Sequence, residues 1–99
     1  MGTGNRMQSF RSAPLVSVVI PVYNAKRYLE ACVRSLEDQS LASFELICVD
    51  DGSTDGSAEL LGTLAKQYEN LRVLSQKHVG VSAARNAGIE DAVGTYLLF

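Results

Sequence analysis

Three short segments of the sequence contain residues that could recognise a ligand. They are PVYN at residues 21–24, the acidic pair that opens DDGSTDGS at residues 50–57, and KHVG at residues 77–80, which is followed by Arg85. A carboxylate accepts hydrogen bonds from the N–H groups of a base or from ribose hydroxyls, a tyrosine ring offers a face for stacking, and an arginine pairs with phosphate. Each of these residue types could therefore contact one part of a nucleotide.

The first segment excludes two common ways of binding phosphate. A dinucleotide fold has G-x-G-x-x-G after its first strand and a P-loop has G-x-x-x-x-G-K-[ST], whereas this chain has Pro21, Val22, Tyr23 and Asn24. Any phosphate must be held elsewhere, by something other than a glycine cradle. Tyr23 offers a flat face to a base, although a tyrosine packed at the end of a strand would give the same sequence.

The second segment places two carboxylates side by side, at Asp50 and Asp51. Adjacent residues of a strand point to opposite faces of the sheet, so only one of the two can face a cleft while the other turns inward or caps a helix. The alternative is that the whole segment is turn chemistry that leads into a helix, with Asp55 as its N-cap.

The third segment combines a flexible glycine with basic residues. Gly80 permits close approach of a ligand to the backbone, and Arg85 lies about one turn into the following helix, where it could reach a pyrophosphate. An ion pair between Arg85 and Asp50 or Asp51 is an equally good interpretation. We interpret His78 as a loop residue rather than a catalyst.

Hydrophobic patterning predicts the elements that position these segments. Strands are expected at residues 15–22, 44–50, 71–74 and 95–99, and helices from Asn24 or Ala25 to about Gln39, at 57–68 and at 82–92. This alternation predicts an α/β fold, a Rossmann-like parallel sheet with helices on both faces. Pro21 is expected to end the pairing of the first strand. Because ligands bind beyond the carboxyl ends of parallel strands, the three segments should meet there.

Composition narrows the class of protein. A chain of 99 residues, 46% hydrophobic and 20% charged, has the balance of one small globular domain, and its net charge of −2 argues against nucleic acid as a partner. No segment approaches the roughly 20 apolar residues of a membrane span, and residues 1–13 form a flexible leader without a signal-peptide core. Cys32 and Cys48 are expected to be small buried hydrophobes in a reducing cytosol, since one histidine cannot complete a zinc site.

The three segments taken together resemble the family 2 glycosyltransferases. VSVVIPVYN, FELICVDDGSTDGS and GVSAARNAGI occur in the order and in the strand–helix context of that family. The resemblance implies a GT-A fold in which residues 14–99 are the N-terminal nucleotide-sugar-binding part, truncated before the rest of the domain. It also implies transfer of a sugar from a nucleotide diphosphate donor, usually a UDP-sugar, to an acceptor hydroxyl with inversion at the anomeric carbon.

The resemblance also assigns roles to individual residues. Pro21, Val22, Tyr23 and Asn24 match the segment that lines the nucleoside pocket, and Asp51 matches the aspartate that hydrogen-bonds uracil. Asp50 matches its neighbour, which is more often structural. In the third motif, Gly80 and Arg85 match residues near the diphosphate or the aspartates.

The chain departs from the family at its end. The relatives have an Asp-x-Asp type motif after the strand that begins at Thr95, where it holds Mg or Mn on the diphosphate, but here the sequence ends at Phe99. The catalytic base and the acceptor site of the family come later still. We therefore expect no catalytic or metal-binding residue in this chain and no transfer by the chain alone.

Two alternatives to an enzyme remain open on the sequence. The chain could be a non-catalytic nucleotide-binding or interaction module. A receiver-type domain is disfavoured because its acidic pair would follow the first strand rather than the second.

The resemblance implies a glycan or lipid-linked acceptor in polysaccharide or cell-envelope synthesis, and a cytoplasmic parent, peripheral on the inner face of the membrane. The exposed edge of the last strand predicts a homodimer.

Overall fold

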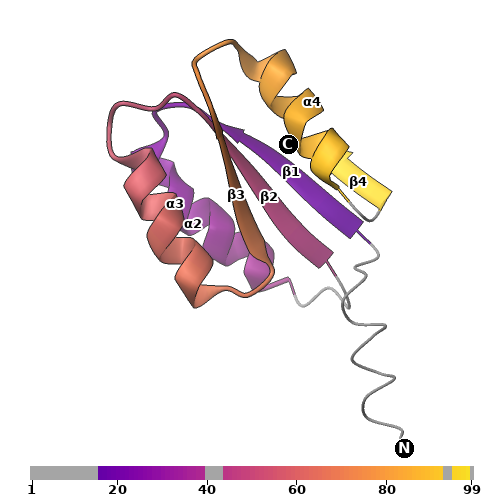
Figure 1. The fold of residues 1–99 in the computed structure, drawn as a ribbon. Helices are drawn as coiled ribbons and strands as arrows, with labels where there is room; N and C mark the ends of the chain where they lie inside the picture. The colour runs from indigo at the N-terminus through magenta and orange to yellow at the C-terminus, as the bar shows by residue number, and fades with distance from the viewer. Residues whose placement is uncertain (1–15, 40–43, 93–94, 99) are drawn as a thin grey trace, which may run out of the picture.

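The computed structural model describes residues 16–39, 44–92 and 95–98, over which four strands alternate with three helices (Figure 1). The expected leader at residues 1–13 and the outer ends of the first and last predicted strands, Leu15 and Phe99, lie outside the described residues. The elements, in chain order, are β1 (Val16–Val22), α2 (Lys26–Glu37), β2 (Phe44–Asp51), α3 (Ser57–Gln67), β3 (Leu71–Gln76), α4 (Val81–Asp91) and β4 (Thr95–Leu98).

All strand pairs are parallel and the strand order is β3-β2-β1-β4, which confirms the predicted α/β class. The two central strands consist largely of β-branched and other apolar residues that are buried on both faces, as expected for strands covered by helices on each side. Pro21 does not end the pairing of β1 with β2, because the register continues one residue further, to Val22 opposite Asp50.

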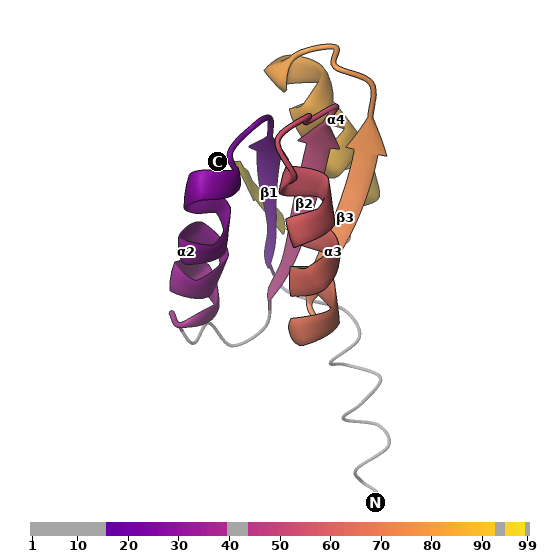
Figure 2. The same cartoon turned by 90° about the vertical axis from the view of Figure 1, so that its left-hand side faces the viewer.

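The helices divide between the two faces of the sheet, with α2 and α3 on one face and α4 on the other (Figures 1 and 2). Strand alternation assigns each side chain to one of two apolar clusters. The larger cluster joins even-numbered residues of β1 and β2, such as Val18 and Cys48, and Leu71 of β3 to the apolar stripes of α2 and α3. In the smaller one, odd-numbered residues such as Val19 and Val49 pack against Ala84 of α4.

Small residues bring α4 close to the sheet, as predicted. Ala84 is fully buried, and an added Cβ on Gly88 would clash with Cγ1 of Val19. A side chain at position 88 would therefore hold the helix away from β1, which explains a glycine inside a helix where it is otherwise unfavourable.

On the other face, the start of α2 and the N-cap of α3 differ from expectation, whereas α3 begins at Ser57 as predicted. Helix α2 begins at Lys26 rather than Asn24, because Asn24 adopts a positive φ of 50°. The N-cap of α3 is Gly56, at φ 96°, and not Asp55, so the capping prediction was wrong. Asp55 instead stabilises both helix starts, since its carboxylate accepts hydrogen bonds from the backbone N–H of Ser57 (3.0 Å) and of Lys26 (3.1 Å).

Both cysteines are free thiols. Cys48 is completely buried in β2, and this burial, followed by the proximity of Cys32, raises its pKa to about 12. Cys32 is partly buried and packs against the same core, so both behave as the small hydrophobes that the sequence predicts. Within the described residues, no helix combines the length and the apolar character needed to cross a membrane.

Candidate nucleotide site

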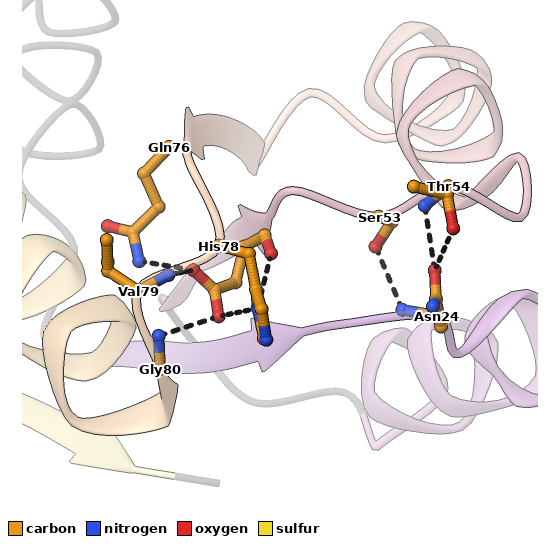
Figure 3. Close-up of polar contacts among 8 residues, drawn as sticks. Asn24, Ser53, Thr54, Gln76, His78, Val79 and Gly80 are labelled. Atoms are coloured by element: carbon orange, nitrogen blue, oxygen red, sulfur yellow. Dashed lines mark hydrogen bonds and ion pairs between the residues drawn. The ribbon is translucent and has the colours of Figure 1, made fainter.

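The carboxylate of Asp51, at the carboxyl end of β2, holds the loop between β3 and α4 in place (Figure 3). Oδ1 accepts hydrogen bonds from Nε2 of Gln76 (2.9 Å) and from the backbone N–H of Val79 (2.8 Å). Oδ2 accepts one from the backbone N–H of Gly80 (3.0 Å) and lies 2.9 Å from Nδ1 of His78. Four nitrogen donors, one from the end of β3 and three from the loop that follows it, thus surround one buried aspartate.

These contacts keep Asp51 ionised. The hydrogen bond from Gln76 and the backbone N–H of Val79, followed by those from Gly80 and His78, lower the pKa of this carboxyl to about 2, against an opposing effect of desolvation. A carboxylate offers about four lone-pair positions, so the loop uses the whole accepting capacity of Asp51 in this conformation.

An aromatic pair lies directly beside this anchor. The ring of Tyr23, which follows β1, stacks on the imidazole of His78 with 4.0 Å between ring centroids and 17° between the planes. A cavity of about 200 Å³ opens here, lined by Pro21, Val22, Tyr23, Asp51, His78 and Val81. The structure therefore brings the first and second predicted segments together at one cavity and adds His78 and Val81 from the third.

Asn24 lies next to this cavity but contacts a different part of the molecule (Figure 3). Its side-chain Oδ1 accepts a hydrogen bond from the backbone N–H of Thr54 (2.8 Å), and its own backbone N–H donates to Oγ of Ser53 (2.9 Å). These bonds tie the turn after β1 to the loop after β2. Asn24 thus fixes the backbone from which Tyr23 projects, and it does not line the cavity.

Asp50 and Asp51 project from opposite faces of the sheet, as strand alternation predicts. Asp50 shares its face with Cys48 and the α2–α3 cluster, and its Oδ1 is buried without a hydrogen-bond partner in the described structure. It is absent from the residues that line the cavity. Asp51 is the member of the pair that faces the cavity.

Arg85 forms no ion pair with another described residue, so the expected pairing with either aspartate is not found. Asp50 lies on the face of the sheet opposite α4, and the acceptor positions of Asp51 are filled by the loop. Arg85 is half-buried on α4, and its Nε is buried without a hydrogen-bond partner among the residues described.

Two glycines allow the loop to reach Asp51. Gly80 has φ 111° and directs its N–H at the carboxylate. Gly52, which follows Asp51 at φ 76°, passes so close to the loop that an added Cβ would lie 2.8 Å from the backbone nitrogen of His78. Gly80 could be singled out from the sequence, whereas the importance of Gly52, Gln76 and His78 depends on the pairing of β2 with β3.

The described residues do not fit a divalent cation. They contain no group of three or more His, Cys, Asp or Glu side chains that could hold a metal ion. The carboxylate that lines the cavity, that of Asp51, already accepts four hydrogen bonds. No chemical step is therefore assigned to a metal held by this part of the chain.

Known proteins are similar to this chain in sequence. Residues 17–99 match the family described as Glycosyl transferase family 2. Among curated proteins, the glycosyltransferase EpsJ of Bacillus subtilis is 44% identical over 86 residues, which is 87% of this chain and 25% of EpsJ. The chain spans about a quarter of the length of the first curated relatives that it matches.

Two solved structures are similar in fold. S. aureus TarS (residues 1–349), solved in complex with UDP, superposes with a TM-score of 0.77 at 29% identity, over 86% of this chain and 26% of TarS. The mannosyltransferase PcManGT of Pyrobaculum calidifontis, in complex with GDP-Man and Mn²⁺, gives a TM-score of 0.74 at 25% identity, over 80% of this chain and 24% of that enzyme.

Proposed function

Because the chain belongs to glycosyl transferase family 2 and has the GT-A type of fold, we propose that the protein containing it transfers a sugar from a nucleotide diphosphate donor to an acceptor hydroxyl, with inversion. Residues 14–99 would be the part that binds the nucleotide. The observation that carries this proposal is the cavity at which Tyr23 offers an aromatic face and Asp51 an ionised carboxylate.

The chemistry of this cavity suits a nucleobase. A base is flat, stacks on an aromatic ring, and presents N–H groups at its edge that a carboxylate can accept. Pro21, Val22 and Val81 supply apolar walls, and the cavity lies at the carboxyl edge of the strands, where ligands of open parallel sheets bind. The complex of TarS with UDP supports uracil as the base and a UDP-sugar as the donor.

The diphosphate of the donor needs a positively charged contact. The half-buried Arg85, with a guanidinium nitrogen that lacks a partner among the described residues, is the proposed contact for the diphosphate. Gly80 and Asn24 act indirectly, through the conformation of the loop and of the turn that carries Tyr23. Asp50 is proposed to be structural.

A divalent cation would offset the charge that develops on the leaving diphosphate. The Mn²⁺ complex of PcManGT supports such a cation in the enzyme. Since the described residues offer no ligand set for it, we expect the 99 residues alone to bind a donor without transferring its sugar.

We further propose a glycan or lipid-linked acceptor in cell-envelope synthesis, peripheral association with the inner membrane face, and a homodimer formed through a sheet edge.

The proposal is tested by calorimetric titration of the chain with UDP, with and without Mg²⁺. When the proteins compared also carry His78→Ala, so that no other ring covers Tyr23, Tyr23→Ala should weaken UDP binding about tenfold or more, because base–aromatic stacking contributes about 1–3 kcal/mol per base. Tyr28→Ala is the matched control, since Tyr28 is 69% exposed on α2 and is not among the residues that line the cavity. Its affinity for UDP should equal that of the protein with His78→Ala alone.

Each outcome has a clear meaning. UDP binding that depends on Tyr23 and not on Mg²⁺ supports a nucleoside pocket that is complete without the cation. Preference for GDP over UDP would keep the function and change the donor. The proposal would be overturned by equal affinities of the Tyr23 and Tyr28 variants, or by the absence of binding to any nucleoside diphosphate.

A further inference from the structure

The imidazole of His78 makes the same two kinds of contact that a nucleobase would need in this cavity. It lies flat on the ring of Tyr23, with 4.0 Å between the centroids. Its Nδ1 lies 2.9 Å from Oδ2 of Asp51. A flat ring on Tyr23 and an edge nitrogen at Asp51 are also what stacking and hydrogen bonding of a base would provide.

Neither contact can be shared with a base in this conformation. Two rings whose centroids are 4.0 Å apart leave no space for a third ring between them. The carboxylate of Asp51 is also filled, because each oxygen already accepts two hydrogen bonds. A base that is to use this face of Tyr23 and this carboxylate must first displace a group that is already there.

His78 is the donor that can leave at the lowest cost. The N–H groups of Val79 and Gly80 belong to the backbone at the start of α4 and cannot turn away without moving the helix. Gln76 donates from its side chain, and its departure would leave the ring of Tyr23 covered by His78. His78 lies in the loop beyond β3, and 56% of its side chain is exposed. Rotation of this side chain into solvent frees both the ring of Tyr23 and one position on Asp51.

We propose that His78 is an internal stand-in for the nucleobase, which occupies the base site in the empty protein and swings out when the nucleotide binds. This inference rests on the proposed nucleoside pocket and makes His78 a determinant of its affinity. When the nucleotide binds, the base replaces the imidazole of His78 on the ring of Tyr23, and an N–H of the base replaces Nδ1 of His78 at Asp51. The affinity of the wild type for nucleotide is therefore lower than that of the same pocket without His78, because binding must first displace the imidazole that occupies the base site.

Calorimetric titration of the chain with UDP distinguishes this role from others. His78→Ala removes the competitor, and we expect it to bind UDP about tenfold more tightly than the wild type, since an aromatic pair and a hydrogen bond no longer have to be broken. His78→Phe retains a ring on Tyr23 without an N–H for Asp51 and should give an intermediate affinity. Gln76→Ala is the matched control: it also removes a donor from Asp51 but leaves the aromatic pair, so it should not tighten binding.

Proton NMR gives a second measurement, because His78 is the only histidine in the chain. At constant pH, its imidazole resonances should be shifted by the ring of Tyr23 in the empty protein and should return toward their positions in Tyr23→Leu when UDP is added. The inference is overturned if UDP binds while these resonances stay in place, or if His78→Ala binds UDP with unchanged or lower affinity. Lower affinity would make His78 a permanent wall of the pocket.

The two proposals fail in different ways. If UDP binds the wild type and His78→Ala equally, the nucleoside pocket stands and the stand-in role is wrong. If neither protein binds a nucleoside diphosphate, the pocket itself is wrong and the stand-in role falls with it. Binding to His78→Ala but not to the wild type would be the strongest support for displacement.

Discussion

At the scale of single residues, Asp51 links ligand chemistry to the stability of the fold. It is a carboxylate of the kind that recognises a base, yet in the empty protein it accepts four hydrogen bonds that fix the loop between β3 and α4. Replacing it would remove a binding group and a structural anchor together. Substitution of Tyr23 is therefore the cleaner test of the pocket, and substitution of Asp51 is the cleaner test of the anchor.

The pKa of Asp51 predicts how the anchor responds to acid. The folded-state pKa is about 2, below the value of ~3.9 for an unperturbed aspartate. The stabilisation by this carboxylate is therefore fully present above about pH 4 and is lost as the pH falls toward 2. In Asp51→Asn, the loss in free energy of unfolding should be constant above about pH 5 and should shrink between pH 4 and 2.

Chemical denaturation of wild type and variant over this pH series measures the difference. A second substitution, Asp38→Asn, serves as a control at the C-terminal end of α2, because that side chain is exposed and does not line the cavity. A difference between wild type and Asp51→Asn that grows as the pH falls would contradict the assigned role.

At the scale of elements, two glycines inside helices make opposite predictions. Gly88 of α4 faces β1, and alanine there would place a methyl group into Val19. Gly62 of α3 has open space around the position of an added Cβ. Gly88→Ala should therefore lower the free energy of unfolding by about 1–3 kcal/mol despite its better helix propensity. Gly62→Ala should raise it by about 0.5–1 kcal/mol.

Urea denaturation of the two variants, with wild type alongside, provides the comparison. The same substitution in two helices isolates packing from propensity, because the gain in helix propensity is common to both. If Gly88→Ala were as stable as Gly62→Ala, the close approach of α4 to β1 would not exist in solution.

Most elements could be predicted because their hydrophobic patterns are strong. The apolar run of β1 and the i, i+3, i+4, i+7 spacing of Leu29, Cys32, Val33 and Leu36 in α2 place these elements correctly within a few residues. The predicted N-cap was wrong because one polar side chain can accept hydrogen bonds from more than one backbone N–H group. Asp55 was expected to cap α3, but it lies one residue too early and bridges to the start of α2, while Gly56 takes the left-handed cap position.

The candidate site could be predicted only in part, for a physical reason. Tyr23 and Asp51 each follow a strand, so the rule that parallel strands end at one edge predicts that they meet. His78 follows no spacing pattern, and its place beside Tyr23 depends on the register that sets Asp51 opposite Gln76. Arg85 has the right residue type, but the sequence could not tell whether loop donors would fill the carboxylate that it was expected to meet.

At the scale of the whole molecule, a network of polar contacts joins β1, β2, β3 and α4 near the amino ends of the strands. At the amino edge, the buried Glu45 accepts hydrogen bonds from Ser17 (2.6 Å) and from Arg72 (2.9 Å), and Arg72 also pairs with Asp91 at the end of α4. Buried polar atoms without a hydrogen-bond partner in the described structure occur at both ends of the strands, on Asp50 and Arg85 and also on Glu37 and Asp91.

The order of the strands predicts self-association. Strands β3 and β4 are the outer strands of the described sheet, and an outer strand presents backbone groups that can pair with another chain. Sedimentation equilibrium of the chain should show a reversible monomer–dimer equilibrium. A monodisperse monomer at high concentration would contradict it. Ser75→Lys, at an exposed position of β3, should weaken a dimer formed through β3 and leave one formed through β4 unchanged.

The same strand order determines when the parts of the protein can assemble during synthesis. Central strand β1 pairs with β2, the next strand to be made, and with β4, the last strand described. All six residues that line the cavity precede residue 82, whereas β4 begins at Thr95. Because chains fold from the N-terminus as they leave the ribosome, β1, β2 and β3 can bring Tyr23, Asp51 and His78 together before β4 is available.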